Sequence, residues 1–405
     1  MNNRALRALK GVLILEVNVL VLGLTSFVTS LGSGVWIWFL SLYVVKELHA
    51  SSVELGLIYL ISLLCFTAGG FLGFMADSIG RRPVISIGTC LLSAITLLMA
   101  CSTTWIEIAL LMGVMRLIQS SYMGSIMAMA SESATPSRSG SALAFINLFS
   151  YAGLVPAPYL GSWLYMVYSS YQKLFAFGAI LIAIAAIARA LTLKETLPKR
   201  TRPVICMSEM KAKISVALKN TKLKWLVAFS GVYAFSANLT MGVYGLWILY
   251  ASEVIGLSSH DIGLWGSIYQ ACFMATMLPA GKLIDKVGFK KALLICIPLE
   301  ALASALFIHA RGLAQVVAIS LIDAVSSSID LVALQTSVAL TSPIEYRAGA
   351  LSLYSSVFYG SSAPSTYVGG HLYAYAKHMP FITSALLQAL SAILLVFLLK
   401  KQKIE

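Results

Sequence analysis

Ionisable side chains occur at few places inside the long apolar stretches of this sequence, at Arg116, Glu300, Asp323 and Asp330. Placing such a group in a bilayer costs roughly 2.5–3.5 kcal/mol, so each one needs a bonding partner or a function. A carboxyl group can take up and release a proton, and a guanidinium can hold a carboxylate or another anion. These residues are therefore the first candidates for chemistry.

Two stripes of polar side chains repeat with the spacing i, i+3, i+4, i+7, which places each stripe on one face of a helix. They consist of Arg116, Gln119, Ser120 and Met123 in one segment, and of Asp323, Ser326, Ser327 and Asp330 in another. Arg116 and Asp323 each lie about ten residues, or roughly 15 Å, from an end of their segments. The two stripes therefore lie at a similar depth.

Other polar groups are expected to have structural roles. Glu300 follows Pro298 closely, and its expected role is to bind backbone groups that the proline leaves free. Arg189 lies near a helix end, from which a long side chain can reach the interface. Tryptophans near the ends of apolar segments are expected in the interfacial belt of a membrane. These are Trp36, Trp38, Trp247 and Trp265.

The composition indicates a membrane protein. Of 405 residues, 59% are hydrophobic and 11% are charged, whereas soluble domains carry about 25% charged residues. Charge-free intervals run over 17–45, 55–76, 83–106 and 139–172, and a membrane helix needs roughly 20 residues. This nearly excludes a soluble enzyme and predicts an all-α membrane protein.

Twelve transmembrane helices are predicted from the spacing of charge and turn clusters. Their expected bounds are 14–45, 53–76, 83–102, 105–131, 140–167, 174–193, 223–252, 261–284, 292–309, 313–339, 348–375 and 379–399. The apolar runs are continuous, which argues against the alternating strands of a membrane barrel.

The net charge is +13, and the basic residues that cause it are distributed unequally between the two sides of the membrane. One set of connectors carries 23 Lys and Arg residues and the opposite set carries four, which predicts that both termini are cytoplasmic. The basic residues lie in short connectors, so nucleic acid is not an expected partner. The expected location is the plasma membrane, with the lipid bilayer as surroundings.

The cysteines and histidines do not predict a metal site. The six cysteines include no CxxC pair, which indicates small core residues rather than ligands. The five histidines fall at the outer ends of the predicted helices. No metal and no cofactor is expected.

An internal repeat divides the chain. The pattern Gly73-x-x-x-Asp77-x-x-Gly80-x-Arg82 recurs 208 residues later as Gly281-x-x-x-Asp285-x-x-Gly288-x-Lys290. The preceding Ser51-Ser52-x-Glu54 recurs as Ser258-Ser259-x-Asp261. The repeat predicts two parallel six-helix halves, at 1–193 and 223–405, joined by a cytoplasmic loop at 194–222.

The repeated loop carries a family resemblance. Gly73-Phe-Met-Ala-Asp77-Ser-Ile-Gly80-Arg81-Arg82 matches the motif G-x-x-x-D-x-x-G-R-[RK] of the major facilitator superfamily (MFS), which the chain resembles over essentially its whole length. Arg116-Leu-Ile-Gln119-Ser120 is similar to the fourth-helix motif R-x-x-Q-G. The fifth-helix motif of proton-linked exporters appears in part, from Gly153 to Ser162.

The resemblance implies that the first, fourth, seventh and tenth helices line a central cavity. The two polar stripes are then expected to face each other, with Asp323 or Asp330 as a protonatable coupling group and Arg116 as a substrate or counter-ion partner. The alternative is a structural polar cluster that joins two helices. Further candidates for the cavity lining, beside Gln119, are Tyr151, Asn238 and Tyr359.

The resemblance also implies a gate in the loop motifs. Asp77, Arg81 or Arg82, and Glu132 are expected to form a latch that stabilises the outward-open state and breaks as the halves rock. Glycines allow close helix packing and a tight turn there. The motif residues are Gly73, Gly80, Gly281, Asp285 and Gly288.

The sequence therefore predicts a secondary transporter for a small organic solute. Proton coupling is expected, with a lean towards efflux of hydrophobic or amphipathic compounds and a monomeric state. The alternative is proton-coupled uptake of a sugar or an organic acid, and a more remote one is a membrane sensor or a membrane enzyme. The chain has no P-loop and no clustered nucleophile and base, so neither ATP-driven transport nor enzymatic activity is expected.

Overall fold

The computed structural model describes residues 17–135, 138–196, 220–342 and 347–401, with the backbone alone at 70–78, 278, 348, 400 and 401. These residues form helices and no strands, as the sequence predicts. Most of the expected central loop, 197–219, lies outside the described residues.

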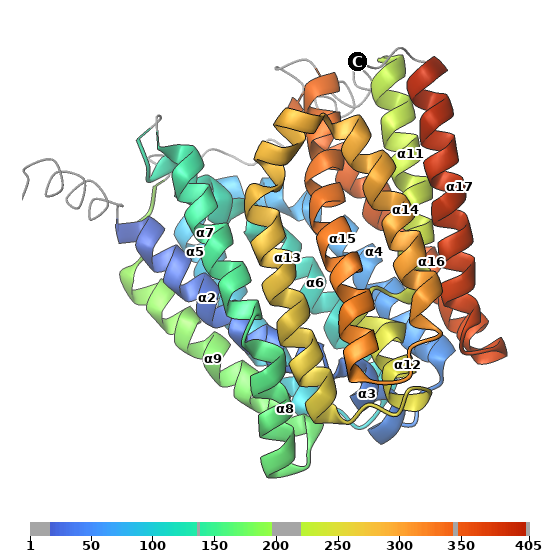
Figure 1. The fold of residues 1–405 in the computed structure, drawn as a ribbon. Coiled ribbons are helices and arrows are strands. Elements are labelled where there is room, and N and C mark those ends of the chain that lie inside the picture. Colours follow the sequence, from blue (N-terminus) through green and yellow to red (C-terminus); the bar gives the residue numbers. More distant parts are fainter. Residues whose placement is uncertain (1–16, 136–137, 197–219, 343–346, 402–405) are drawn as a thin grey trace, which may run out of the picture.

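The helices follow the expected order (Figure 1). The N-terminal helices are α2 (Val17–Ile37), α3 (Leu40–Leu42), η1 (Tyr43–Glu47), α4 (Ser52–Ile79), α5 (Arg81–Ala100), α6 (Trp105–Glu132), α7 (Ser139–Leu154), α8 (Ala157–Tyr168) and α9 (Tyr171–Thr192). The C-terminal helices are α11 (Thr221–Ala237), η2 (Asn238–Thr240), η3 (Val243–Trp247), α12 (Ile248–Glu253), α13 (Ser259–Val287), α14 (Phe289–Phe307), α15 (Leu313–Thr341), α16 (Arg347–Tyr375) and α17 (Met379–Lys401).

Nine of these helical runs are long and apolar enough to cross a membrane, among the described residues. The other three expected spans coincide with α13, α14 and α16. Charge and polarity lower the apolar character of these helices, because α14 contains two lysines and a glutamate and α16 is rich in serine and glycine.

Repeated sequence produces repeated local structure. Ser51 and Glu54 bond reciprocally through backbone and side chain where α4 begins, and Ser258 and Asp261 do the same at α13. Each pair satisfies backbone N–H groups that a helix start leaves free. The two copies of the pattern thus start equivalent helices.

The first and seventh spans are both interrupted. After α2 the chain turns at Trp38 and Phe39 before α3 and the π-helical η1. In the seventh span, Met241 and Gly242 have φ of 57° and 64° and are followed by the π-helical η3. Such breaks free backbone groups, which are tolerated at membrane depth only beside protein or a cavity. The freed carbonyl of Tyr244 accepts hydrogen bonds from Ser41 and Tyr59.

The two ends of the helix bundle differ in their contacts. We call them the His49 end, where α3 and α12 lie, and the Lys401 end, where α17 ends (Figure 1). At the His49 end, N-terminal and C-terminal helices meet closely. Ser52 donates to the carbonyl of Gly370, and Thr366 donates to the carbonyl of Gly56, at 2.9 and 3.1 Å.

Aromatic rings continue this junction into the bundle. Trp38 contacts Tyr244, Trp265 and Tyr269 of the C-terminal helices, with ring centroids 5.3, 5.6 and 6.1 Å apart. All four tryptophans that were expected in the interfacial belt are instead buried, at 2% exposure or less. The expectation was wrong because position near a helix end does not show which face of the helix the ring occupies.

Candidate functional site

Candidate residues line an N-terminal and a C-terminal cavity in the described part of the bundle. The N-terminal cavity has a volume of about 310 Å³ and is lined by residues between Ser26 and Arg189 together with Tyr244. The C-terminal cavity has a volume of about 240 Å³ and is lined by residues between Tyr233 and Gln388. Both are close to the lower size limit of small-molecule sites.

The two polar stripes line different cavities. Arg116 and Gln119 lie in the N-terminal cavity, whereas Asp323, Ser327 and Asp330 lie in the C-terminal cavity. The expected arrangement of Arg116 opposite Asp323 or Asp330 stays a prediction.

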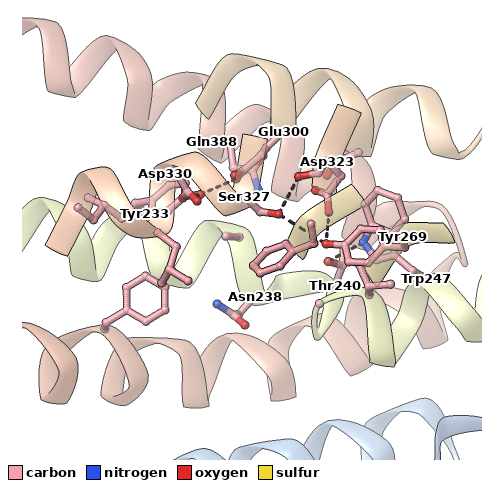
Figure 2. Close-up of a pocket in the computed structure, with 18 of the residues that line it drawn as sticks. Tyr233, Asn238, Thr240, Trp247, Tyr269, Glu300, Asp323, Ser327, Asp330 and Gln388 are labelled. Atoms are coloured by element: carbon pink, nitrogen blue, oxygen red, sulfur yellow. Dashed lines mark hydrogen bonds between the residues drawn. The ribbon is translucent and has the colours of Figure 1, made fainter. Parts of the chain in front are cut away.

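In the C-terminal cavity, three carboxyl groups, two of them buried, lie opposite Asn238 (Figure 2). Asp323 and Asp330 come from α15, and Glu300 comes from α14, which packs along α15. Glu300 and Asp330 are 3% and 5% exposed. The sequence predicted that Glu300 binds backbone groups near Pro298, whereas its side chain lines the cavity beside the two aspartates.

One tyrosine hydroxyl joins two of these carboxyls. Tyr233 of α11 bonds to Glu300 Oε2 at 2.5 Å and also to Asp330 Oδ2. A hydroxyl has a single proton and can donate only once. Both contacts are hydrogen bonds only when one of the two carboxyl groups is itself protonated and donates to the tyrosine oxygen. One added proton on either carboxyl would therefore satisfy both contacts.

The third carboxyl has a separate tyrosine partner. Tyr269 of α13 donates to Asp323 Oδ2 at 3.0 Å, and its ring contacts Trp38 at the junction of the two sets of helices. Asp323 is therefore connected through one side chain to the closed His49 end.

The cavity also contains buried acceptors without a partner among the described residues, Glu300 Oε1 and Gln388 Oε1. The orientation of Gln388 is fixed by Ser384. That serine donates its hydroxyl proton to the carbonyl of Ser236, so it can only accept from the Gln388 amide nitrogen. These two acceptor oxygens can each accept a hydrogen bond from a donor group that enters the cavity, and the carboxyl oxygen can also bind a proton.

Of the remaining candidates for the cavity lining, one lines a cavity and two contact aromatic rings instead. Asn238 lines the C-terminal cavity and donates to Ser362. Tyr151 contacts the ring of Phe273 at 5.9 Å, and Tyr359 contacts Phe66 at 4.8 Å. Neither of these two tyrosines is among the residues that line the cavities.

Part of the expected gate is brought together at the Lys401 end. Arg81 Nη2 lies 3.3 Å from Glu132 Oε1, and Arg82 donates to the carbonyl of Ala190. At Gly73 and Asp77 the structure describes the backbone alone, so the expected role of the Asp77 carboxylate stays a prediction. In the second copy of the motif, Gly281, Asp285 and Gly288 are exposed, with a positive φ of 85° at Gly288.

Sequence reasoning did not identify Glu195, which completes this cluster. Its carboxylate accepts from the backbone N–H groups of Arg81 and Arg82, at 3.0 and 3.2 Å, where α5 begins. A carboxylate there accepts hydrogen bonds from free N–H groups, and its negative charge interacts favourably with the positive end of the helix dipole. Gly80 has φ of 111°, and a Cβ there would lie 2.6 Å from Glu195 Oε2. No pattern in the sequence near Glu195 indicates this contact.

We predict that Glu195→Gln lowers the stability of the protein by about 1 kcal/mol, because a charge-assisted cap at the start of α5 is lost. The measurement is the melting temperature of purified protein in detergent. Asp285→Asn is the control, since this exposed carboxylate has no bonded partner among the described residues. Equal melting temperatures for wild type and Glu195→Gln would show that the cap does not matter.

Comparison with known proteins identifies the family. The model of the Major Facilitator Superfamily matches residues 22–245 and 229–405. The chain belongs to the major facilitator superfamily, whose members are transporters rather than enzymes.

Individual relatives are distant in sequence. An uncharacterised MFS-type transporter of Methanocaldococcus jannaschii is 24% identical over 397 residues, 95% of each chain. The structure of the nucleoside transporter NupG is similar with a TM-score of 0.76 and 16% identity, over 95% of this chain and 99% of that one. The human organic anion transporter MFSD10 gives a TM-score of 0.67 and 17% identity, over 94% and 99%. These solved structures share the fold.

Proposed function

We propose that this chain is a proton-coupled secondary transporter that moves a small organic solute by alternating access. The observation that carries the proposal is the carboxyl pair of Glu300 and Asp330, which shares the single hydroxyl of Tyr233 inside a cavity. Buried ionisable groups in membrane proteins mark proton and substrate pathways.

The carboxyl pair supports proton coupling because it can hold, exchange and release a proton. A proton can move between Glu300 and Asp330 through the Tyr233 hydroxyl, which donates to one carboxyl as it accepts from the other. Loss of the shared proton would leave two carboxylates on one hydroxyl, and like charges at this distance repel strongly. Protonation or deprotonation of the Glu300–Asp330 pair can therefore change how α11, α14 and α15 pack together.

The junction at the His49 end supports alternating access. Rocking of the N-terminal helices against the C-terminal helices must break the contacts of Ser52 with Gly370, and of Trp38 with Tyr269. Because Tyr269 also bonds Asp323, protonation of Asp323 can affect this junction directly. We take Asp323 as a second coupling group.

We propose that the Lys401 end faces the cytoplasm, since most Lys and Arg residues belong to connectors on that side. On this orientation the structure is closed towards the outside. The cluster of Arg81, Glu132 and Glu195 joins N-terminal residues and is formed in this outward-closed state, so we propose that the latch of the outward-open state depends on Asp77 rather than on this cluster alone. The protein is proposed to act as a monomer in the plasma membrane.

The direction of transport has two candidates. The partial fifth-helix motif, with Pro156 and Pro158 between glycines, favours efflux of amphipathic compounds. The second candidate is uptake of an organic acid with a proton, and the cavity position of the Arg116 guanidinium favours it.

Reconstitution into proteoliposomes tests the proposed function. We expect an imposed pH gradient to drive the flux of at least one solute from a panel of Hoechst 33342, 2-naphthalenesulfonate and glucose, well above the flux in empty liposomes. The sign of the gradient that drives accumulation separates efflux from uptake. Flux that is insensitive to the pH gradient for a transported solute would contradict proton coupling.

A further inference from the structure

Arg189 is a buried cation that the proposed mechanism does not use. It lies on α9 with 1% of its surface exposed, and it lines the N-terminal cavity. The sequence predicted that its side chain would reach the membrane interface, but the structure directs it into the bundle. A buried charge without compensation is expensive, so its partners need to be identified.

Hydroxyl groups from two other helices hold the Arg189 guanidinium. Its Nε, Nη1 and Nη2 atoms donate to Thr25, Thr89 and Ser26, at 2.9, 2.7 and 3.2 Å. The hydroxyls of Thr25 and Thr89 donate their own protons to backbone carbonyls, so their lone pairs are fixed towards the guanidinium. Three of its five N–H donors are used in this way, and the Tyr122 hydroxyl is a further hydrogen-bond partner of the guanidinium, so one donor remains.

Arg116 adds a second cation to the same cavity. It donates from Nε to Ser62 and from Nη1 to the Gln119 side-chain oxygen, at 3.3 and 3.0 Å. Its Nη2 atom has no hydrogen-bond partner among the described residues. Neither Arg116 nor Arg189 forms an ion pair with a described carboxylate.

The lining of the cavity lacks negative charge. Among the described residues that line it there are two arginines and no aspartate or glutamate. The titratable neighbours of Arg116 are the tyrosines Tyr59, Tyr122, Tyr244 and Tyr359, and that of Arg189 is Tyr122. Hydroxyl groups can solvate a guanidinium, but they do not neutralise it.

Beside the hydroxyls of Thr29, Ser30, Ser33 and Ser150, much of the remaining lining is apolar or aromatic. It includes Trp36, Leu92, Met115, Tyr122, Met123 and Met127. An apolar cavity with a few fixed polar groups suits a ligand with an apolar body and one polar end, and methionines adapt to varied shapes.

We infer that the N-terminal cavity binds an aromatic organic anion, whose anionic group is held by the free N–H donors of Arg116 and Arg189. The ligand supplies the charge that the cavity lacks, and its ring packs on the apolar lining. This inference names the substrate class within the proposed function, on which it rests for its physiological meaning. The C-terminal cavity, with its carboxyl groups, then binds the proton, and the N-terminal cavity, with its two arginines, binds the solute.

The test is binding to purified protein in detergent, by isothermal titration, with 2-naphthalenesulfonate and its neutral analogue 2-naphthalenesulfonamide. We expect the sulfonate to bind at least tenfold more tightly, since charge-assisted hydrogen bonds to the guanidinium are lost with the amide. Arg189→Gln and Arg116→Gln should each weaken sulfonate binding tenfold or more. Arg311→Gln is the control, because Arg311 is exposed in the loop between α14 and α15.

Arg189→Lys provides a variant that keeps the charge if Arg189→Gln does not fold, and it should still weaken sulfonate binding because the planar fork is lost. Equal binding of sulfonate and sulfonamide by the wild type, or wild-type sulfonate affinity in Arg189→Lys and Arg116→Gln, would overturn the inference. Sulfonate binding without transport of any panel solute would instead contradict the proposed function. Transport of Hoechst 33342 without sulfonate binding would contradict only the inference.

Discussion

Asp330→Asn is expected to abolish the response of transport to a pH gradient, with a fall in gradient-driven flux of about tenfold or more. Asparagine cannot bind or release a proton, and its amide cannot share the Tyr233 hydroxyl with Glu300 as a carboxyl does. Downhill exchange of the solute, which needs no net proton movement, should persist. The measurement is flux in proteoliposomes with and without an imposed gradient.

Two further variants show whether the shared proton matters. Tyr233→Phe removes the bridging hydroxyl and should reduce gradient-driven flux as Asp330→Asn does, with little change in exchange. Asp261→Asn is the matched control, because the Asp261 carboxylate only accepts hydrogen bonds, from the backbone N–H of Ser258 at the start of α13, and an asparagine oxygen can also accept there. Normal gradient-driven flux in Asp330→Asn and Tyr233→Phe would assign the cluster a structural role only.

Gly370→Ala is expected to disfavour closure of the His49 end and to reduce transport about tenfold or more. A Cβ at Gly370 would lie 2.4 Å from the backbone carbonyl oxygen of Ser52, a contact that real side chains do not make. Backbone there cannot move away without separating α4 from α16, which pack along each other. The variant should therefore favour states that are open at this end.

Accessibility measures this shift. Ser41 is fully buried near the junction, and Ser41→Cys in a cysteine-free background should react faster with an aqueous maleimide when Gly370→Ala is added. Gly360→Ala is the control on the same helix, since a Cβ there meets no atom within 4 Å. An unchanged rate of reaction with Gly370→Ala would show that this contact does not control closure.

The helical fold could be predicted because its signals are local. Charge-free intervals of sufficient length, and repeated caps such as Ser51 with Glu54, determine helices without reference to the rest of the chain. The scarcity of charge also identified Arg116 and Asp330, since any ionisable group in an apolar span requires an explanation.

The contacts within the sites could not be predicted, because they join residues far apart in the sequence. Arg189 was misplaced because its hydroxyl partners come from α2 and α5, at separations of 164 and 100 residues. Glu300 was given a structural role near Pro298 because only the packing of α14 against α15 places it near Tyr233. Burial of Trp38 likewise depends on rings contributed by α13 and η3.

At the Lys401 end, the contact of Glu195 could not be predicted for the same reason. Its carboxylate binds the start of α5 across 113 and 114 residues of sequence. The repeat cannot reveal it, because it relates one half of the sequence to the other and gives no contact within either half.

The central claim, that solute movement and proton movement are coupled, is tested most directly by measuring protons during solute flow. Proteoliposomes containing the pH dye pyranine would receive an inward gradient of 2-naphthalenesulfonate, whose sulfonate group stays charged at neutral pH, with membrane voltage clamped. The account predicts a change in lumenal pH with the wild type and none with Asp330→Asn. Solute entry through the wild type at constant lumenal pH would contradict it.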